Sequence, residues 1–502
     1  MPGDVYVRAA ATPGDLDGGD GSLADPFHSV EVGIRSLQGS GGGIVRLFGG
    51  THFIESVVLD SISGLDEEHR IVVCPVAGSG EVFIDSCLPE FLAPNGRWIE
   101  VAPPHGVSGE YIWPDRFDFP GARIVHRGAF FDWPGHARLV SYDRVEDLRS
   151  ARQEWPQNEG DNRVFVPNPN DPNDPPTTFV PQFVDGKPTR RPWVYMGPGI
   201  WFDPSPEPDI KDASGKVVSY GGRHVHIRLA KTTNHVPSWA DYEGESSPND
   251  LRLALSMDQT RALFLKSCRH IKFEHLTLRF GSPETVLLNN CSDIVFDHCR
   301  IRSGSRAIFL NVDGDKPHDE NRDILVEHCE IDGGIPTWFF RSDRKDVYRY
   351  GPEDKDLVTE DETTDNQLGH ATSGVQLSGR ARSFNVVVHH CEIFNAHDSY
   401  IFGDGMSFHH NWVRNLNDDG IAVSADAQTK NAKIFCNVMT KCLTALSFAA
   451  RRLDVVYIYG NLFDLREPTL GIRPSGPDTG VTDSLRQGHF FKDGADEGPI
   501  EL

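Results

Sequence analysis

Two short segments contain three aspartates, whose carboxyl groups could supply a catalytic acid and a catalytic base. The segments read NAHDSYIF (395–402) and NLNDDGIAVSA (415–425), and they contain Asp398, Asp418 and Asp419. Two carboxyl groups about 5 Å apart disfavour each other's ionisation, so one keeps its proton while the other is ionised. Glycoside hydrolysis needs such a pair: separations of about 5 to 5.5 Å suit a retaining nucleophile, and about 6.5 to 9.5 Å leave room for an inverting water. We therefore predict paired-carboxylate catalysis at these segments.

Further polar side chains lie close to these aspartates in the sequence. His397 adjoins Asp398. A His-Asp pair could act as a base with its orienting group, or it could form only a turn hydrogen bond. Arg380, Asp404 and Asp426 lie beyond the apolar strands of the same segments. We predict that His397 and Asp404 assist catalysis and that Arg380 and Asp426 contact the substrate.

A repeat must position these groups. An apolar strand followed by a turn and another apolar pair recurs seven times, at steps of 23, 30, 62, 20, 26 and 24 residues. A period of roughly 20 to 26 residues without a helical pattern predicts stacked coils of β-strand, because one coil cannot bury its apolar face alone. We therefore predict an all-β chain folded as a parallel β-helix, whose long groove suits polymers. Asp398 and Asp419, 21 residues apart, would then lie on one edge of adjacent coils. The copies are IKFEHLTL (271–278), IVFDHCRI (294–301), ILVEHCEI (324–331), VVVHHCEI (386–393), MSFHHNWV (406–413), AKIFCNVM (432–439) and VVYIYGNL (455–462).

The histidines and cysteines of the repeat are predicted to be structural. Their spacing follows the period of the fold, so we interpret the histidines as stacked residues on the solvent side and not as a metal site. Most of the nine cysteines fall at repeat positions, which predicts reduced thiols and not a disulfide framework. The histidines are His275, His298, His328, His390 and His410, and the stacked turn residues beside them are Cys299, Cys329, Cys391, Asn411, Asn437 and Asn461.

The N-terminal segment predicts a cap for the coils. A strand at 5–8 and an acidic, Gly-rich turn precede an amphipathic helix with Val30, Ile34 and Leu37 on one face, and a strand at 44–47 follows. This order, with Asp-Pro-Phe before the helix and Gly-Gly-Thr-His-Phe after the second strand, resembles the N-terminal cap of carbohydrate-active right-handed β-helix proteins of the pectin-lyase-like superfamily. The resemblance implies that the helix plugs the open end of the solenoid. Any solenoid must also cover its terminal strands to stay soluble.

The aspartate segments resemble the site of polygalacturonase-type glycoside hydrolases. In that family an Asn-x-Asp turn is followed one coil later by an Asp-Asp turn that opens an apolar strand. Asp398 matches the first aspartate, and Asp418 and Asp419 match the pair. The family's later Gly-His-Gly and Arg-x-Lys are absent, and only Arg451 or Arg452 could supply the basic element. Asp-Asp-Gly-Ile is also a common turn in β-helices, where Asp caps backbone N–H groups.

The chain divides into four predicted parts. The period breaks across a stretch rich in Pro, Trp and Asp, which we interpret as an inserted, mainly antiparallel β module. Trp193, Tyr195 and Trp201 of this module either line a substrate wall or form its own core. The parts are the N-terminal cap and first coils (1–104), the module with Pro-rich loops (105–260), the main coils (261–469) and a C-terminal tail or incomplete coil (470–502).

One coil carries a long loop at 333–373. Long loops on a regular scaffold are often functional, and aromatic and basic side chains stack on sugars or pair with carboxylates. We therefore predict that Trp338, Arg341, Arg344 and Tyr348 contact the substrate, as does Arg451 further along the chain. The alternative is a loop that packs on the solenoid or on a neighbouring subunit.

Composition limits the partners. The chain has 49 basic and 73 acidic residues in 502, a net charge of −24, which repels nucleic acid. Residues 1–30 lack a basic head with an apolar run, and no apolar stretch is long enough to span a bilayer, so we expect a soluble protein without a membrane partner. Reduced cysteines favour the cytoplasm over secretion with a removed leader. A homo-oligomer remains open.

Three functions fit these observations. The first is a glycoside hydrolase that acts on a poly- or oligosaccharide and needs no cofactor. The second is a polysaccharide lyase or uronate epimerase, in which Asp carboxylates hold Ca²⁺ and Arg380, Arg451 or His397 removes a proton. The third is a non-catalytic glycan-binding or structural β-helix, against which the long loop and the inserted module argue.

Overall fold

The structure is a computed structural model. It describes part of the chain in detail, and all structural statements below refer to that part. The described residues are 3–10, 18–54, 56–92, 96–101, 103, 105–117, 124–132, 136–142, 145–149, 163–166, 178–181, 183–184, 187–188, 195, 197–203, 205–231, 241–257, 259–282, 284–302, 306–311, 319–334, 373–377, 383–396, 399–401, 404–416, 419–424, 430–442, 444–449 and 455–464.

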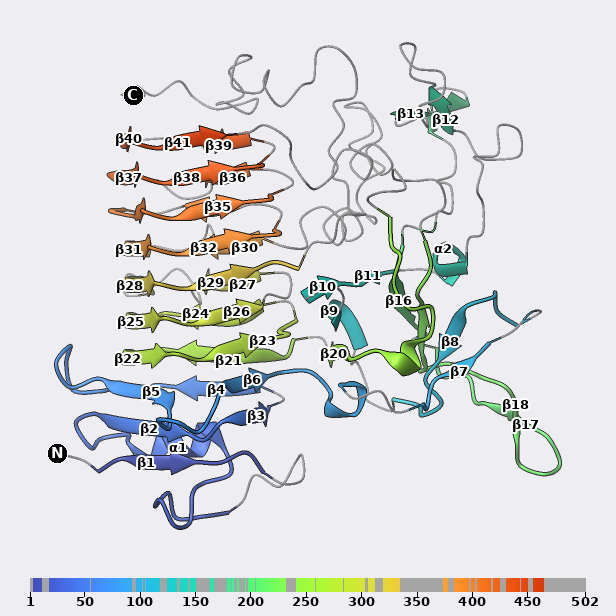
Figure 1. Cartoon of the computed structure of the whole chain (residues 1–502), viewed down its shortest axis with the longest axis horizontal. Coiled ribbons are helices and arrows are strands. Elements are labelled where there is room, and N and C mark those ends of the chain that lie inside the picture. The colour runs from blue at the N-terminus through green and yellow to red at the C-terminus, as the bar shows by residue number, and fades with distance from the viewer. Residues whose placement is uncertain are drawn as a thin grey trace.

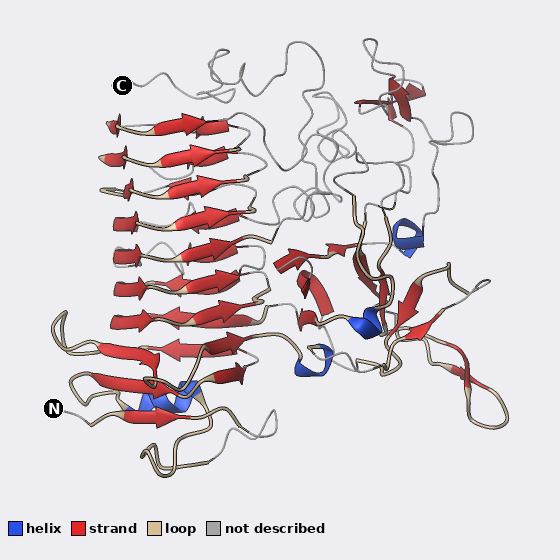
Figure 2. Cartoon of the chain, in the orientation of Figure 1, coloured by secondary structure: helices blue, strands red, loops and turns tan. Residues whose placement is uncertain are grey.

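Most of the described chain forms stacked coils with three parallel sides (Figures 1 and 2). Sheet A has ten strands, sheet B has nine, and the third side consists of the five-stranded sheet C and the three-stranded sheet D. From residue 43 onward a strand of sheet A leads to one of sheet B, then to one of the third side, and then to the next strand of sheet A. We call the connections A–B, B–C and C–A turns, counting sheet D with sheet C. The predicted all-β fold with long parallel sheets is confirmed.

The strands of sheets A and B are listed in the order in which they pair. Sheet A contains β1 (Val5–Val7), β2 (Gly43–Leu47), β5 (Ile71–Pro75), β22 (Arg269–Glu274), β25 (Ser292–Asp297), β28 (Asn321–Glu327), β31 (Ser383–His389), β34 (Ser407–His409), β37 (Ala432–Phe435) and β40 (Val456–Tyr459). Sheet B contains β3 (Gly50–Phe53), β6 (Val82–Asp85), β23 (Thr277–Arg279), β26 (Arg300–Arg302), β29 (Glu330–Asp332), β32 (Glu392–Phe394), β35 (Trp412–Arg414), β38 (Val438–Thr440) and β41 (Leu462–Asp464).

The strands of the third side form two separate sheets. Sheet C contains β4 (Ser56–Asp60), β21 (Arg261–Lys266), β24 (Glu284–Asn289), β27 (Arg306–Asn311) and β30 (Ser373–Leu377). Sheet D contains β33 (Tyr400–Ile401), β36 (Asp419–Ser424) and β39 (Thr444–Ala449).

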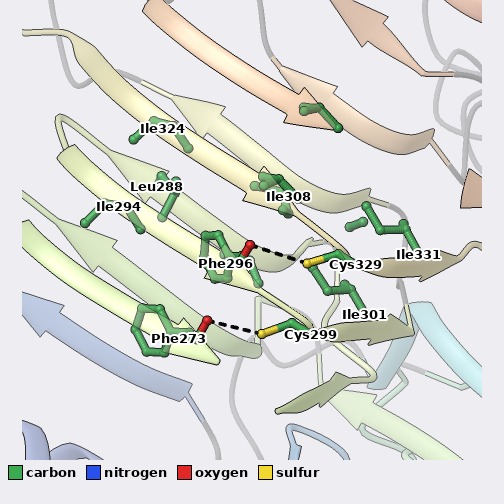
Figure 3. Close-up of a cluster of buried hydrophobic side chains, with 14 of the residues drawn as sticks. Phe273, Leu288, Ile294, Phe296, Cys299, Ile301, Ile308, Ile324, Cys329 and Ile331 are labelled. Atoms are coloured by element: carbon green, nitrogen blue, oxygen red, sulfur yellow. Dashed lines mark hydrogen bonds between the residues drawn. The ribbon is translucent and has the colours of Figure 1, made fainter. Parts of the chain in front are cut away.

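Alternation along the strands builds the interior of the coils. Successive residues of a strand point to opposite faces, so every second side chain is apolar and enters one continuous core. Equivalent residues stack from coil to coil: the rings of Phe273 and Phe296 lie 5.4 Å apart at an angle of 14°. Figure 3 shows residues of all three sides meeting in this core, among them Ile294 and Ile324 of sheet A, Ile301 and Ile331 of sheet B, and Leu288 and Ile308 of sheet C.

Each A–B turn from β22 onward rests on one residue in the left-handed conformation. The strand register aligns the seven copies of the repeat as the sequence predicts. In each copy the residue after the strand of sheet A has a φ between 52° and 67°, a region where histidine is tolerated better than most side chains. These residues are His275, His298, His328, His390, His410, Cys436 and Gly460.

The residue after each left-handed position points inward, and from Cys299 onward its side chain donates a hydrogen bond to the neighbouring coil. Cys299 and Cys329 donate weak S–H hydrogen bonds to the carbonyls of Phe273 and Phe296 (Figure 3). The next coils use amides: the Asn437 Oδ1 accepts the backbone N–H of Asn411 at 3.0 Å, and further amides extend this ladder to both sides. The predicted stack of cysteines and asparagines is therefore a hydrogen-bonded ladder.

The N-terminal end carries the predicted helix. Helix α1 (Val30–Ser36) begins at Ser29, whose hydroxyl accepts the Val32 N–H. Val30, Ile34 and Leu37 are buried in the core of the coils. The helix packs on β1, β2 and β4, the first strands of the stack.

A separate module leaves the coils after β6 and returns before β21. It includes η1 (Pro89–Phe91) and a strand at Ile99–Glu100, so its structure begins before the expected boundary at residue 105. One sheet has the order β11-β16-β19-β8-β7 and another has β10-β9-β20, and all their pairs are antiparallel except β11 with β16. The strands are β7 (Ile99–Glu100), β8 (Glu110–Ile112), β9 (Ile124–Asp132), β10 (His136–Arg138), β11 (Val140–Ser141), β16 (Gly199–Phe202), β19 (Val225–Arg228) and β20 (Leu253–Met257).

The module has its own hydrophobic core. Tyr195 is fully buried there, and its hydroxyl donates to the carbonyl of Arg228 at 2.9 Å. Trp201 packs against the same core, and Trp193 lies outside the described residues. The core interpretation therefore holds for Tyr195. The remaining elements of this region are α2 (Val145–Arg149), β12 (Arg163–Val166), β13 (Thr178–Pro181), β14 (Phe183–Val184), β15 (Lys187–Pro188), β17 (Ile210–Lys211), β18 (Val217–Ser219) and η2 (Pro248–Asp250).

Helices are few and short in the described chain. None of those helices has the length and apolar character that crossing a lipid bilayer requires.

We expect the amide ladder to contribute strongly to stability. In Asn437→Ala the backbone N–H of Asn411 and the carbonyl of Phe408 lose their buried partner, so the free energy of unfolding should fall by about 3 kcal/mol. Urea denaturation followed by circular dichroism measures this change. Cys329→Ala is the matched control at an equivalent position, and its loss should be smaller because a thiol is a weak donor. An equal or larger loss for Cys329→Ala would contradict the importance of the amides.

Candidate functional site

The longest connections of the described coils leave at B–C turns. The module stands between β6 and β21, and residues 333–372 connect β29 to β30. The segments of the predicted aspartates are B–C turns too: 395–399 joins β32 to β33, and 415–418 joins β35 to β36. Figure 1 shows the strands of the module beside the stacked coils and not at either end. The B–C edge therefore gathers the insertions and the aspartate segments on one side of the molecule.

The module contacts this edge directly. The backbone N–H of Arg138, at the end of β10, donates to the carbonyl of Gly334 at 2.8 Å. Gly334 is the second residue after β29 and lies at the start of the long connection to β30. The module leaves the coils after β6 and contacts the coil of β29, which is three strands further along sheet B.

Only one residue of the predicted aspartate cluster is placed by the structure. Asp419 is the first residue of β36, where it pairs with Thr444. Asp398 and Asp418 lie outside the described residues, as does His397. The register of sheet D pairs Tyr400 with Ala422. These two residues are 22 positions apart in the sequence. The predicted pairing used the separation of Asp398 and Asp419, which is 21 residues.

Asparagines mark the start of both aspartate turns. Asn395 and Asn415 follow β32 and β35, and both have positive φ, 51° and 56°. The amide Nδ2 of Asn415 donates to the Oδ1 of Asn395 at 3.4 Å, and the Nδ2 of Asn395 donates to the Oδ1 of Asp332 at 3.3 Å. Asp398 and Asp418 each stand three residues after one of these asparagines. By sequence count from these asparagines, Asp398 corresponds to Asp418, and Asp419 is the next residue.

Asp332 anchors the ladder as a buried carboxylate. It forms an ion pair with Arg302 and accepts the backbone N–H of Gly334 at 2.9 Å. Burial raises the pKa of Asp332, while Arg302, Gly334 and Asn395 oppose that rise without cancelling it. Two coils earlier, Arg279 binds the buried carboxylate of Asp85 through two hydrogen bonds of 2.6 Å. Ion pairs of this kind fix the ends of sheet B, from which the B–C turns start.

Asp404 is not at this edge. It forms β-bridges with Phe384 and Lys430 at the entrance to sheet A, so it belongs to the C–A turn. Its Oδ1 accepts the Nδ2 of Asn431 at 3.2 Å. Asp419 starts a strand of sheet D, whereas Asp404 follows the end of another, so the structure does not bring the two together.

The remaining predicted site residues lie outside the described part of the chain, so their roles stay predictions. They are Arg380, Asp426, Arg451, Trp338, Arg341, Arg344 and Tyr348.

The histidines form columns on the A–B turns, at the other end of sheet B. The left-handed histidines stack over five coils, with ring centroids 4.7 to 5.4 Å apart. Beside them the last positions of sheet A form a second column, in which the rings of His389, His409 and Phe435 stack at 5.0 and 4.6 Å. Burial, followed by the neighbouring histidines, lowers the pKa of His409 to about 4. The predicted ring stack is confirmed, and the second column is a feature that the sequence analysis missed.

No family model and no curated protein matches the sequence. Among solved structures, a protein described as "Glycoside hydrolase" aligns with a TM-score of 0.42 and 11% identity, covering 95% of this chain and 100% of its own. The GH136 lacto-N-biosidase from Eubacterium ramulus gives 0.35 and 10%, covering 91% of this chain and 56% of its own. The tailspike protein gp49 from Pseudomonas phage LKA1 gives 0.27 and 10%, covering 86% and 69%. At such values these comparisons assign no function to this chain.

We expect the stability of the coils to fall in acid through His409. Its pKa lies near 4 when folded and near the ordinary 6.5 when unfolded, so the unfolded chain takes up a proton first as the pH falls. This contribution to stability is intact above pH 6.5 and is lost as the pH falls from about 6.5 towards 4. His409→Phe keeps the stack, because Phe435 occupies the next position of the column. The free energy of unfolding of this variant should therefore depend less on pH between 7 and 4 than that of the wild type.

Urea unfolding at a series of pH values tests this, with His275→Asn as a control in the other column. Identical pH profiles of wild type and His409→Phe would refute it.

Proposed function

We propose that this chain is a carbohydrate-active enzyme on a right-handed parallel β-helix, and that it hydrolyses glycosidic bonds of a poly- or oligosaccharide. The three parallel sides with one strand per coil support the β-helix. The position of the aspartate segments on the B–C edge, beside the module, supports the enzyme.

The single observation that carries the proposal is the ladder from Asp332 through Asn395 to Asn415. It holds the starts of two successive B–C turns one coil apart, and each turn has an aspartate three residues further on. Neighbouring parallel strands lie about 4.8 Å apart, so carboxyl groups on adjacent coils fall within the range that glycoside hydrolysis uses. In this proposal Asp398 and Asp418 form the pair and Asp419 is the third carboxyl group.

The chemistry divides between the carboxyl groups. Repulsion between the like charges raises the pKa of one, which protonates the leaving oxygen of the glycosidic bond. The other stays ionised and either attacks the sugar or activates a water, depending on their separation. Because a pair of carboxyl groups carries the proton transfers, this mechanism proceeds without a metal.

The surroundings of the edge supply the substrate contacts in this proposal. The connection after Asp332 contains Trp338, Arg341, Arg344 and Tyr348, and aromatic and basic side chains suit sugar rings and acidic sugars. The module is joined to the first residues of that connection through Arg138 and Gly334. We place the glycan along this edge, between the module and the aspartate turns.

We expect loss of activity when either member of the pair is neutralised. Asp398→Asn and Asp418→Asn remove a proton donor or acceptor, so kcat should fall by roughly 10²- to 10⁴-fold on the glycan that the wild type cleaves. Mass spectrometry of the products from a panel of neutral and uronate-containing glycans measures this, and products that have gained water identify hydrolysis. Asp419→Asn tests the third carboxyl group in the same assay.

The matched control is Asp323→Asn. Asp323 is an exposed aspartate at the entrance of sheet A with φ 55°, a conformation that asparagine also adopts, so this variant should keep its activity. Unsaturated products that disappear with a chelator would instead indicate a Ca²⁺-dependent lyase. No turnover on any glycan would overturn the proposal in favour of a binding scaffold.

A further inference from the structure

The A–B corner lies at the other end of sheet B from the B–C turns, and it brings together metal-ligating side chains from two adjacent coils. Asp297 ends β25 and His298 follows it in the left-handed position, while His328 holds the same position one coil later. One donor atom from each of these three residues lies within 4.8 Å of the other two. Among the described residues this is the one group of three or more His, Cys, Asp or Glu side chains that meets this criterion.

Asp297 occupies the centre of the group. Its Oδ1 lies 2.5 Å from the Nδ1 of His298 and 3.4 Å from the Nδ1 of His328. Its other oxygen, Oδ2, accepts the ammonium of Lys272 at 2.8 Å, and Lys272 also binds Glu274. The lysine thus fixes the orientation of the carboxylate and leaves Oδ1 directed towards both imidazoles.

We infer that Asp297, His298 and His328 form a binding site for a transition-metal dication of the Zn²⁺ type. Zn²⁺ binds His nitrogen at about 2.0 to 2.1 Å and carboxylate oxygen at about 2.0 to 2.2 Å, so tetrahedral ligands around it stand roughly 3.3 Å apart. The Asp297–His328 separation already has that size, and Asp297 and His298 need only a small opening to reach it. Two imidazoles and one carboxylate are ligands that Zn²⁺, Ni²⁺ and Cu²⁺ accept and that Ca²⁺ and Mg²⁺ do not prefer.

The side chains can adjust and remain accessible. His298 and His328 expose 50% and 43% of their side chains, so an ion reaches them without opening the coils. Both rings rotate about their side-chain bonds while the backbone stays in place. On binding, the ion takes the lone pair of each Nδ1, and the ring proton resides on Nε2 or is released.

Ring stacking alone does not account for the group. His390 and His410 stack just as closely, at 5.1 Å, yet the sheet A residues that precede them are histidines. At the equivalent position of the column the residues are Glu274, Asp297, Glu327, His389 and His409, and only Asp297 is an aspartate. The side chain of Asp297 places Oδ1 within 3.4 Å of the Nδ1 atoms of both histidines.

Such an ion would link two adjacent coils in addition to the backbone hydrogen bonds between their strands. Asp297 and His298 belong to one coil and His328 to the next, so the bound ion would link β25 and β28 at the solvent edge. An ion that binds only the folded chain raises the temperature of unfolding by mass action.

The test is equilibrium dialysis of the full-length chain, without a polyhistidine tag and freed of metal by a chelator, against ZnCl₂. We expect one saturable Zn²⁺ per chain and a higher Tm in its presence. Asp297→Asn, His298→Asn and His328→Asn should each weaken Zn²⁺ binding by roughly tenfold or more. Asparagine suits the left-handed positions, so the histidine variants should fold, and circular dichroism checks this.

Two control variants make the result specific. His275→Asn alters the same column one coil earlier, at a histidine that is not part of the group of three, and should leave binding unchanged. Cys436→Ser removes the exposed thiol. Thiols also bind Zn²⁺, but Cys436 is not part of the proposed site, so this variant should leave binding unchanged. Absence of saturable binding, or equal weakening by His275→Asn and His328→Asn, would overturn the inference. None of these outcomes depends on glycan cleavage.

Discussion

Backbone hydrogen bonds between successive coils determine how the other parts of this fold can be arranged. Each strand pairs in parallel with its counterpart one coil away, so a residue's neighbours are set by the repeat and not by the chain around it. Inward positions must then stack like on like, as Phe273 and Phe296 do. Turns must also superimpose, which explains why one left-handed residue recurs at each A–B turn of the main coils. The amides and thiols beside it satisfy the groups that the turn leaves unpaired.

The pairing of the strands restricts the length of the turns differently at different corners of the coil. The A–B turn has a fixed length through seven coils, and its side chains form continuous columns of rings and donors. The B–C turn varies from a few residues to the whole module, because it needs only its two ends held in register. Arg302 with Asp332, and Arg279 with Asp85, hold those ends. Turns of constant length and turns with insertions are thus separated onto different corners of one coil.

The repeat was predictable from the sequence, whereas the site was predictable only in part. All seven copies fall in the predicted register. The repeat could be recognised because each copy has its apolar strand residues and its turn at the same relative positions. The pairing of Asp398 with Asp419 rests on a step of 21 residues, whereas Glu392 pairs with Trp412 in sheet B and Tyr400 with Ala422 in sheet D, steps of 20 and 22 residues. Asp404 is close to the aspartates in sequence, but it follows strand β33 and belongs to the C–A turn. Tyr195 shows the same limit, since composition did not decide whether an aromatic residue faces a ligand or a core.

The position of the module also shapes how the chain is made. Strands β4, β5 and β6 find their next partners in β21, β22 and β23, and the whole segment 86–260 lies between the end of β6 and the start of β21. At a synthesis rate of about 5 to 20 residues per second, roughly ten to thirty-five seconds pass before those partners leave the ribosome. During that interval the first coils present an open apolar edge, while the module, with a core of its own, can complete its fold. The insertion therefore delays the pairing of the first coils with the main coils until the module has been synthesised.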